Sequence, residues 1–292
     1  TYTDVLTPLA MPATPFHLTI RAASEQRPTI LLGADWPLTG GAATGSLTLD
    51  GLFISGGQID LQGTLGELTV RHCTLDPGGG LSPDGVTSRP MQQSLSAAAT
   101  NDQLAIAIDH CIVGALRIPR QAAALRITDS IVDAQGGVAI SGPGGANDFA
   151  ARSTIRTTTI FGQCWLQELL LGSEVLFDDV VTVARTQTGC VRFSYLAPGS
   201  LTPRTHECVP SAGATPAEQT RLAPAFTSRR FGDPGYAQLS RSGPVAIATG
   251  ASDGSEIGAF SRLLNPQRER NLLIRLDEYL PFGLVAALIY VT

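Results

Sequence analysis

Two short segments of the chain place a histidine directly before a cysteine, as His72–Cys73 and His110–Cys111. Imidazole nitrogens and thiolates are preferred ligands of zinc and copper, so these four side chains could form a metal centre. The two pairs could also be equivalent positions of a repeating structure, because Cys73 and Cys111 are 38 residues apart. The elements that carry the pairs must decide between these interpretations.

Carboxylates are the other candidates for catalysis. Asp178 and Asp179 are adjacent, and a pair of carboxylates can hydrolyse a glycosidic bond. Asp129 and His110 occupy similar places in the repeat described below, where a carboxylate–histidine row could do acid–base chemistry. Neighbouring residues of a strand point to opposite faces, however, so Asp178 and Asp179 would need a bend to cooperate. Polar residues are also usual at solenoid corners, and we therefore favour no catalytic residue.

A glycine-rich turn in the last third of the chain combines charged and aromatic residues. Arg229, Arg230, Asp233 and Tyr236 surround the Gly-Asp-Pro-Gly segment 232–235. Arginine and tyrosine are enriched where proteins contact other molecules, so this is a candidate binding site. The alternative is an arginine–aspartate pair that only holds the loop in place.

Two further pairs of residues suggest a metal site and a disulfide. Asp253 and Glu256 lie in one acidic loop and are candidate calcium ligands, although the loop lacks the further spaced acids of a calcium-binding motif. Cys190 and Cys208 flank a proline-containing segment and could be bridged, or could remain two free thiols. We expect no resident metal and no cofactor.

The elements that position these residues follow from a repeat. The segments 68–79, 104–115, 125–137 and 153–163 share a frame of alternating apolar residues, two polar residues, and then two inward positions separated by one residue. The spacing indicates a period of about 19–21 residues, and the 38 residues between the cysteines are twice that period. Alternation is typical of strands, and a fixed period of this length is typical of stacked coils. The sequence predicts an all-β, right-handed parallel β-helix with loop insertions at 81–102 and 141–153.

The frame places each cysteine inside and each histidine outside. Cys73, Cys111, Ser130 and Thr158 share one inward corner position, and the residues before them lie on the solvent side. We therefore interpret the cysteines as small core residues and the histidines as solvated corners. On this view a Cys73→Ser change would put a hydroxyl into an apolar row and destabilise the fold.

Outside the repeat we expect an N-terminal extension at 1–17 and a loop-rich region at 198–292, with the β-helix at 18–197 between them. Within the last region, 266–280 has the apolar stripe of a helix, with Asn265 as its cap and Pro281 after its end. The apolar segment 284–291 reads as a final strand. We expect the helix and the strand to pack on the solenoid and cap its open end.

The composition excludes several classes of function. The chain has 292 residues, and its formal net charge is −5 with 20 basic residues, all arginine. A net negative charge argues against a nucleic-acid partner, and the absence of lysine excludes Schiff-base chemistry. No apolar run reaches the roughly 20 residues that a membrane helix needs, and the first residues do not form a signal peptide.

Several segments of the chain resemble a group of largely uncharacterised bacterial proteins. The likeness rests on "LTLDGLFISGG", "GCVRFSYLAPGS", "SDGSEIGAF" and "QRERNLLIRLDEYLPFGL", and it spans about 17–292. The resemblance implies a carboxy-terminal β-helix of a larger protein, encoded near phage-tail-like or contractile injection components. It transfers no catalytic residue to this chain.

Together these observations favour a non-enzymatic structural or binding module of a larger bacterial surface, phage-like or injection assembly. Its partners would be other domains or subunits of that assembly, with polysaccharide as a second class. The alternative is a polysaccharide-degrading lyase or glycoside hydrolase, whose site would lie on the outward strand face or at the loops 81–102 and 141–153.

Overall fold

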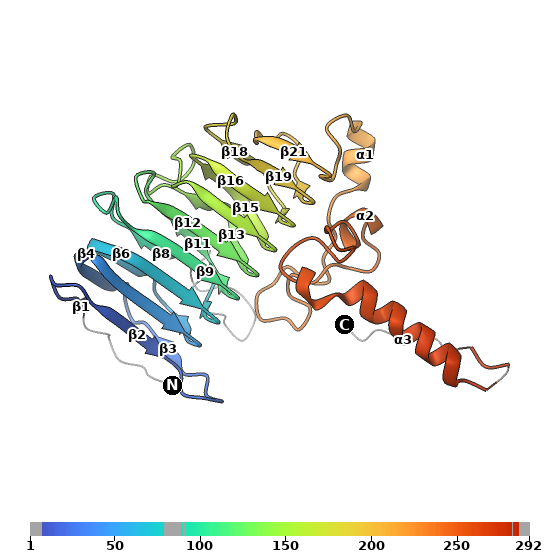
Figure 1. Ribbon diagram of the computed structural model, residues 1–292, viewed down its shortest axis with the longest axis horizontal. Helices are drawn as coiled ribbons and strands as arrows, with labels where there is room; N and C mark the ends of the chain where they lie inside the picture. The colour runs from blue at the N-terminus through green and yellow to red at the C-terminus, as the bar shows by residue number, and fades with distance from the viewer. Residues whose placement is uncertain (1–7, 79–88, 90–91, 282, 286–292) are drawn as a thin grey trace.

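The chain folds as a right-handed parallel β-helix followed by a loop-rich region (Figure 1). The structure, a computed structural model, describes residues 8–78, 89, 92–281 and 283–285. A full coil contributes a strand to each of three faces, which are separated by bends of the chain. Within each face the strands run parallel. This arrangement confirms the fold class that the repeat predicts. Among the described residues, no helix has the length and apolar character needed to cross a bilayer.

The three faces are defined by their strand pairings. Face A consists of β2 (His17–Arg21), the ends of β4 (Trp36–Asp50) and β6 (Ile59–Arg71), β9 (Ala105–Asp109), β12 (Ala124–Thr128), β14 (Ser153–Arg156), β16 (Leu169–Ser173), β19 (Cys190–Arg192) and β21 (Arg204–His206). Face B consists of β3 (Thr29–Leu31), β5 (Phe53–Ser55), β7 (Thr74–Leu75), β10 (Ile112–Val113), the starts of β13 (Ile131–Ser141) and β15 (Thr159–Leu166), β17 (Leu176–Phe177) and β20 (Tyr195–Leu196). Face C consists of β1 (Leu9–Ala10), the starts of β4 and β6, β8 (Gln93–Ala97), β11 (Ala115–Arg117), the ends of β13 and β15, and β18 (Val181–Val183).

The spacing of the two cysteines has a different cause from the one the sequence suggests. Strand β7 pairs directly with β10, with Thr74 opposite Ile112, so Cys73 and Cys111 lie on adjacent coils. The 38 residues between them are one coil with an insertion, and not two coils. Part of the expected loop 81–102 is in fact β8, which pairs with β6 and β11 on face C. The rest of that loop includes 81–88 and 90–91, which lie outside the described residues.

The strands also extend beyond the limits that the repeat defines. β1 at Leu9–Ala10 pairs with β4 inside the segment 1–17, and β21 at Arg204–His206 adds a rung to face A beyond residue 197. These strands have only two and three residues, too few to show the alternation on which the sequence argument depends.

Whereas the first corner, between β2 and β3, is a longer segment at 22–28, the corner between faces A and B repeats with the same backbone from β4 to β21. Its outward residue has a positive φ throughout: Gly51, His72, His110, Asp129, Thr157, Glu174, Phe193 and Glu207. The following residue points inward, as in Cys73, Cys111 and Ser130, whose exposed fractions are at most 3%. The predicted outward histidines and inward cysteines are therefore confirmed. Left-handed backbone is unfavourable for residues other than glycine, so something must hold each corner.

Hydrogen bonds from the inward side chains hold these corners. The thiol of Cys111 donates to the carbonyl oxygen of Asp109 across the turn (3.1 Å), and Ser130 Oγ donates to Thr128 in the same way (2.6 Å). Each side chain also accepts a backbone N–H from the preceding coil, with Cys73 N–H bonded to Cys111 Sγ (3.4 Å) and Cys111 N–H to Ser130 Oγ (3.0 Å). The expectation of a wholly apolar row is therefore wrong, although Leu52 and Val175 occupy this position at two corners.

The loop-rich region covers part of face B. Short helices α1 (Pro216–Arg221) and α2 (Val245–Ala248) and the 3-10 turn Ser261–Leu263 interrupt it. Ile247 and Ile257 pack on Leu176 and Tyr195 of face B. In Figure 1, α1 lies beside β21 at the end of the solenoid.

Helix α3 (Asn265–Tyr279) forms where the sequence predicts it but packs differently. Its N-cap is Leu264, with φ 53°, so Asn265 is the first helical residue and not the cap. No residue of α3 is buried, with Leu272 and Leu273 exposed by 48% and 44%, and the helix extends away from the coils (Figure 1). An amphipathic stripe predicts a helix but not its partner, so the capping role is not realised. Of the expected strand 284–291, 286–291 lie outside the described residues.

A test of the corner hydrogen bonds compares two substitutions of Cys111. Cys111→Ser keeps a donor and an acceptor at this position, so we expect it to change the free energy of unfolding by less than about 1 kcal/mol. Cys111→Val leaves Cys73 N–H without its acceptor and removes one of the two donors to the Asp109 carbonyl, which keeps the N–H of His72, and we expect a loss of about 1–3 kcal/mol. Chemical denaturation measures both. A valine variant as stable as the serine variant would show that the thiol acts only by filling space.

Candidate functional site

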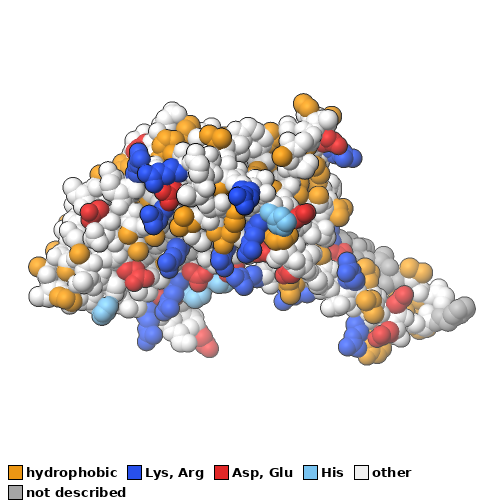
Figure 2. Space-filling model, turned by 45° about the horizontal axis from the view of Figure 1, so that its top comes forward, with side chains coloured by type: hydrophobic (Ala, Val, Ile, Leu, Met, Phe, Trp, Pro, Cys, Tyr) orange, Lys and Arg blue, Asp and Glu red, His pale blue; other side chains and the backbone are white. Residues whose placement is uncertain are grey.

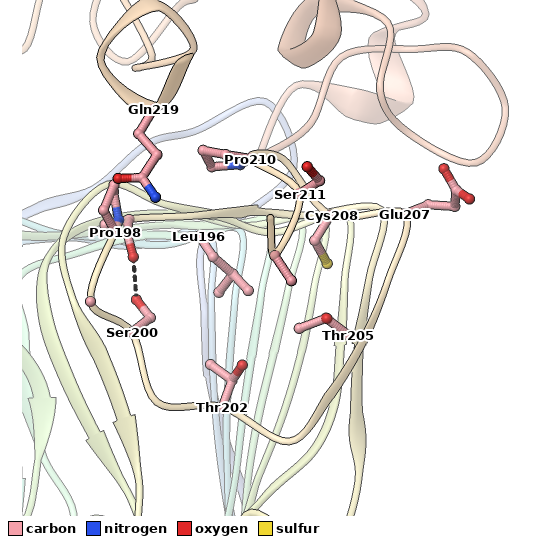
Figure 3. Close-up of a pocket in the computed structure, with 13 residues that line it drawn as sticks. Leu196, Pro198, Ser200, Thr202, Thr205, Glu207, Cys208, Pro210, Ser211 and Gln219 are labelled. Atoms are coloured by element: carbon pink, nitrogen blue, oxygen red, sulfur yellow. Dashed lines mark hydrogen bonds between the residues drawn. The ribbon is translucent and has the colours of Figure 1, made fainter. Parts of the chain in front are cut away.

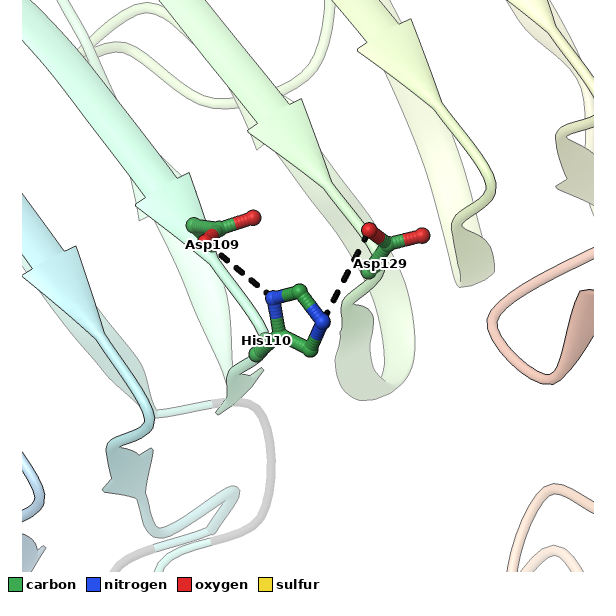
Figure 4. Close-up of side chains that lie close together, drawn as sticks. All are labelled: Asp109, His110 and Asp129. Carbon is green, nitrogen blue, oxygen red and sulfur yellow. Dashed lines mark ion pairs between the residues drawn. The ribbon is translucent and has the colours of Figure 1, made fainter. Parts of the chain in front are cut away.

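Among the described residues, one cluster of side chains that could bind a metal ion is found. It lies on the outer side of the corner between faces A and B, where β9 and β12 end. Its ligand-type atoms come from Asp109, His110 and Asp129 and lie within 4.8 Å of one another. His110 Nδ1 is 3.1 Å from Asp109 Oδ2, and Nε2 is 3.7 Å from Asp129 Oδ2 (Figure 4). The positive φ of His110 (51°) and Asp129 (48°) turns both side chains outward, to the mouth of a cavity of about 480 Å³.

The carboxylate of Asp129 already accepts hydrogen bonds from neighbouring side chains. Arg262, in the loop-rich region, donates Nε–H to Asp129 at 2.7 Å, and the hydroxyl of Thr157 also donates to it. The carboxylate beside it raises the pKa of the Arg262 guanidinium. A guanidinium in this position repels a cation and neutralises the charge a metal would need, so the cluster fits an ion-pair fastening better than a metal centre.

The four residues of the two His–Cys pairs do not converge. The rings of His72 and His110 lie side by side outside, with centroids 5.5 Å apart and planes tilted by 41°, while both thiols point into the core. Burial raises the pKa of the Cys111 thiol to about 12, which keeps it protonated. A shared metal centre is therefore excluded for these pairs, as the alternating strand geometry predicts.

Asp178 and Arg229, which the sequence suggests for separate sites, bind each other. Arg229 donates from both terminal nitrogens to the two oxygens of Asp178, at 2.6 Å each. Its guanidinium also lies over the rings of Phe226 and Phe161, at 4.9 and 5.4 Å from their centroids. Asp179 instead accepts the N–H of Val180 (2.6 Å). The adjacent aspartates do not act as a pair, because Asp178 fastens the loop-rich region to face B.

The remaining residues of the predicted binding site divide between core and surface. The Tyr236 hydroxyl donates to Asp133 at 2.7 Å under the loop, and both side chains are buried. Arg230 Nε is 3.7 Å from Asp233, and both remain largely exposed, so this is a weak surface pair. Asp133 is not among the candidates that the sequence suggests. The one sequence feature that could have pointed to it is a carboxylate within the apolar segment 131–134.

Asp253 and Glu256 do not form a calcium site. Asp253 accepts the N–H and the hydroxyl of Ser255, at 2.9 and 2.5 Å, which closes a local turn. Glu256 is buried and bonded to the side chain of Asn265, and its burial raises its pKa. Within the described residues, neither carboxylate belongs to a cluster of three or more side chains that could bind a metal ion.

Cys190 and Cys208 are free thiols, so the candidate disulfide is not formed. Cys208 occupies the inward corner position of the last coil and donates to the carbonyls of His206 and Val191, each at 3.5 Å. It also lines a pocket of about 500 Å³ between that coil and α1 (Figure 3). Glu207 is the single charged residue in the pocket lining, and burial raises the pKa of the Cys208 thiol, so the pocket holds no activated nucleophile.

Compared with known proteins, the chain matches no family model, no curated sequence and no solved structure.

A test of the Asp178–Arg229 fastening compares two neighbouring arginines. Arg229→Gln removes the two charge-assisted bonds and the contact with the two rings, and we expect it to weaken the attachment of 226–240 by about 1–2 kcal/mol. Arg230→Gln, the matched control, loses only an exposed pair. Hydrogen–deuterium exchange of peptides from this segment measures the difference. Equal protection in the two variants would contradict the fastening role.

Asp133 predicts a pH dependence of stability. Burial raises its pKa, so the folded state holds its proton more tightly than the unfolded chain does. Its contribution to stability is therefore present below the unfolded pKa near 4 and is lost as the pH rises through the folded pKa. Asp133→Asn cannot titrate, and we expect its stability relative to the wild type to rise between pH 4 and pH 7. Denaturation at the two pH values checks this, and a constant difference would contradict it.

Proposed function

We propose that the chain is a non-enzymatic structural or binding module of a larger bacterial surface, phage-like or injection assembly. The observation that carries the proposal is the engagement of its acid–base candidates. Both oxygens of Asp178 are bound by Arg229, and Asp129 is bound by Arg262. A general base needs a lone pair free for the substrate proton, and in both carboxylates arginine N–H groups already occupy the oxygens that a substrate would need.

Two further features support a module within an assembly. Helix α3 extends from the body with apolar side chains exposed, among them Leu272 and Ile274, as expected of a segment whose neighbours belong to a larger structure. The solenoid presents long faces of parallel strands, and such extended surfaces suit binding and spacing. The resemblance of the sequence to β-helix regions of larger proteins points the same way.

A polysaccharide-degrading enzyme is the second candidate, and one observation favours it. His110 lies between the carboxylates of Asp109 and Asp129 at the mouth of a cavity, which is an arrangement that acid–base catalysts use. Arg262 counts against it, because the guanidinium already neutralises Asp129.

The test is an assay for glycan cleavage with matched variants. Polygalacturonate, alginate and neutral glucans are incubated with the wild type, His110→Gln and Asp129→Asn, and new reducing ends and unsaturated products are measured. We expect no cleavage by any of the three proteins, and changes in melting temperature only. Cleavage by the wild type that either substitution abolishes would establish the enzyme and overturn the proposal.

A further inference from the structure

Face A changes its charge pattern halfway along the solenoid. In its first half, the outward position before the corner carries alternating charges in register: Arg21, Asp50, Arg71 and Asp109. Arg71 and Asp50 form an ion pair of 3.1 Å. In its second half, the same position carries Thr128, Arg156, Ser173, Arg192 and His206. The acids disappear from this column, and the arginines remain.

The neighbouring outward column adds two more arginines, Arg126 and Arg204. The five strands β12, β14, β16, β19 and β21 contain no aspartate or glutamate at all. Arg126, Arg156, Arg192 and Arg204 are exposed, and no carboxylate of the described chain lies within ion-pair distance of any of them. Arginines that fasten the loop-rich region, such as Arg229, have such a partner.

A polar groove adjoins the start of these strands. It has a volume of about 500 Å³, and its lining combines three arginines, Arg120, Arg152 and Arg185, with two acids, Asp102 and Glu168. Arg185 is paired with Glu168 at 2.7 Å, which leaves Arg120 and Arg152 without an ion pair in the described chain. The Oε1 atom of Gln167, also in the lining, is buried without a hydrogen-bond partner. Arg152 directly precedes β14, so groove and strand face form one continuous basic surface.

This surface is unusual for a chain whose net charge is −5. Figure 2 shows arginine side chains gathered over the coils, with fewer acidic side chains among them. Like charges on adjacent strands repel each other, and an anionic ligand would relieve that repulsion. The loop-rich region packs on face B, so it does not cover these arginines.

The spacing of the arginines indicates the kind of anion. Coils repeat about every 4.8 Å along the solenoid axis, so the arginines form an axial row in which Arg156 and Arg192, two coils apart, are separated by about 10 Å. A linear chain of uronic acids carries one carboxylate per sugar, so the carboxylates of alternate sugars can meet Arg156 and Arg192, and its hydroxyls can bond to the part-exposed Thr128 and Thr154 beside the arginines. Nucleic acid fits less well, because these strands contain no Phe, Tyr or Trp on which bases could stack.

We infer that the second half of face A, from β12 to β21, together with the adjoining groove, binds a linear acidic polysaccharide laid along the solenoid axis. The inference deepens the proposed function, because it names the ligand class of the binding module and rests on the chain being such a module. The site holds the polymer through arginines and hydroxyls.

The experiment measures affinity for polygalacturonate, neutral dextran and a single-stranded oligonucleotide by calorimetry at low and moderate salt. We expect the wild type to bind polygalacturonate, to bind it more weakly as salt rises, and not to bind dextran. Arg126→Gln, Arg156→Gln and Arg192→Gln combined should weaken binding about tenfold or more. The control combination Arg221→Gln, Arg268→Gln and Arg270→Gln removes the same charge from the helices and should leave the affinity within about twofold.

A triple lysine variant at positions 126, 156 and 192 guards against a folding artefact, and it should bind within a few-fold of the wild type. The inference is overturned if the wild type binds no polygalacturonate, if both glutamine combinations weaken binding equally, if dextran binds as well, or if the oligonucleotide binds at least as tightly. Reducing ends are measured in the same samples. Binding with cleavage would refute the proposed non-enzymatic function and keep the site, whereas neither binding nor cleavage would refute the site alone.

Discussion

The corner between faces A and B is the constraint on which the rest of the molecule depends. From β4 to β21 each coil turns through a residue with positive φ. At Cys73, Cys111, Ser130 and Ser194 the thiol or hydroxyl of the next residue donates to the carbonyl two residues before it and accepts an N–H from the preceding coil. Cysteine and serine serve equally well here because both are small, donate one hydrogen and accept another. The same backbone turns His110 and Asp129 outward, so the corner fixes what lies on the surface as well as what lies in the core.

The charged residues outside this corner fall into two groups with different physical roles. Asp129 and Asp178 lie on the side that the loop-rich region covers, and arginines 133 and 51 residues away in the sequence neutralise them. The arginines on the far half of face A have no such carboxylate partner among the described residues, and they are exposed. Carboxylates that the sequence suggests as catalytic residues thus attach the loop-rich region to the coils. The positive charge without a paired carboxylate belongs to the arginines of face A, which form no recognisable sequence motif.

Local patterns in the sequence predicted the strands and the direction of their side chains. They did not predict the contacts between distant segments that hold the strands and the loop-rich region together. Alternation and the 19-residue step from Cys111 to Ser130 predicted the strands, the inward cysteines and the outward histidines, because each depends on a few neighbouring residues. The direct pairing of β7 with β10, the Tyr236–Asp133 bond and the exposure of α3 depend on contacts between distant segments, which periodicity does not encode. The row of arginines on face A could not be predicted from the sequence either. Only the register of strand pairing shows that Arg156 and Arg192 lie in one column, two coils apart.

Residue-resolved amide hydrogen exchange tests the role of the corner most directly. The N–H groups of Leu52, Cys73, Cys111 and Val175 each donate to a thiol or hydroxyl of the neighbouring coil. If these bonds hold the coils in register, these amides exchange as slowly as those in the middle of face A, such as Ile127. Exchange as fast as that of the exposed turn at Gly145 would show that the corners open freely and that packing alone holds the coils together.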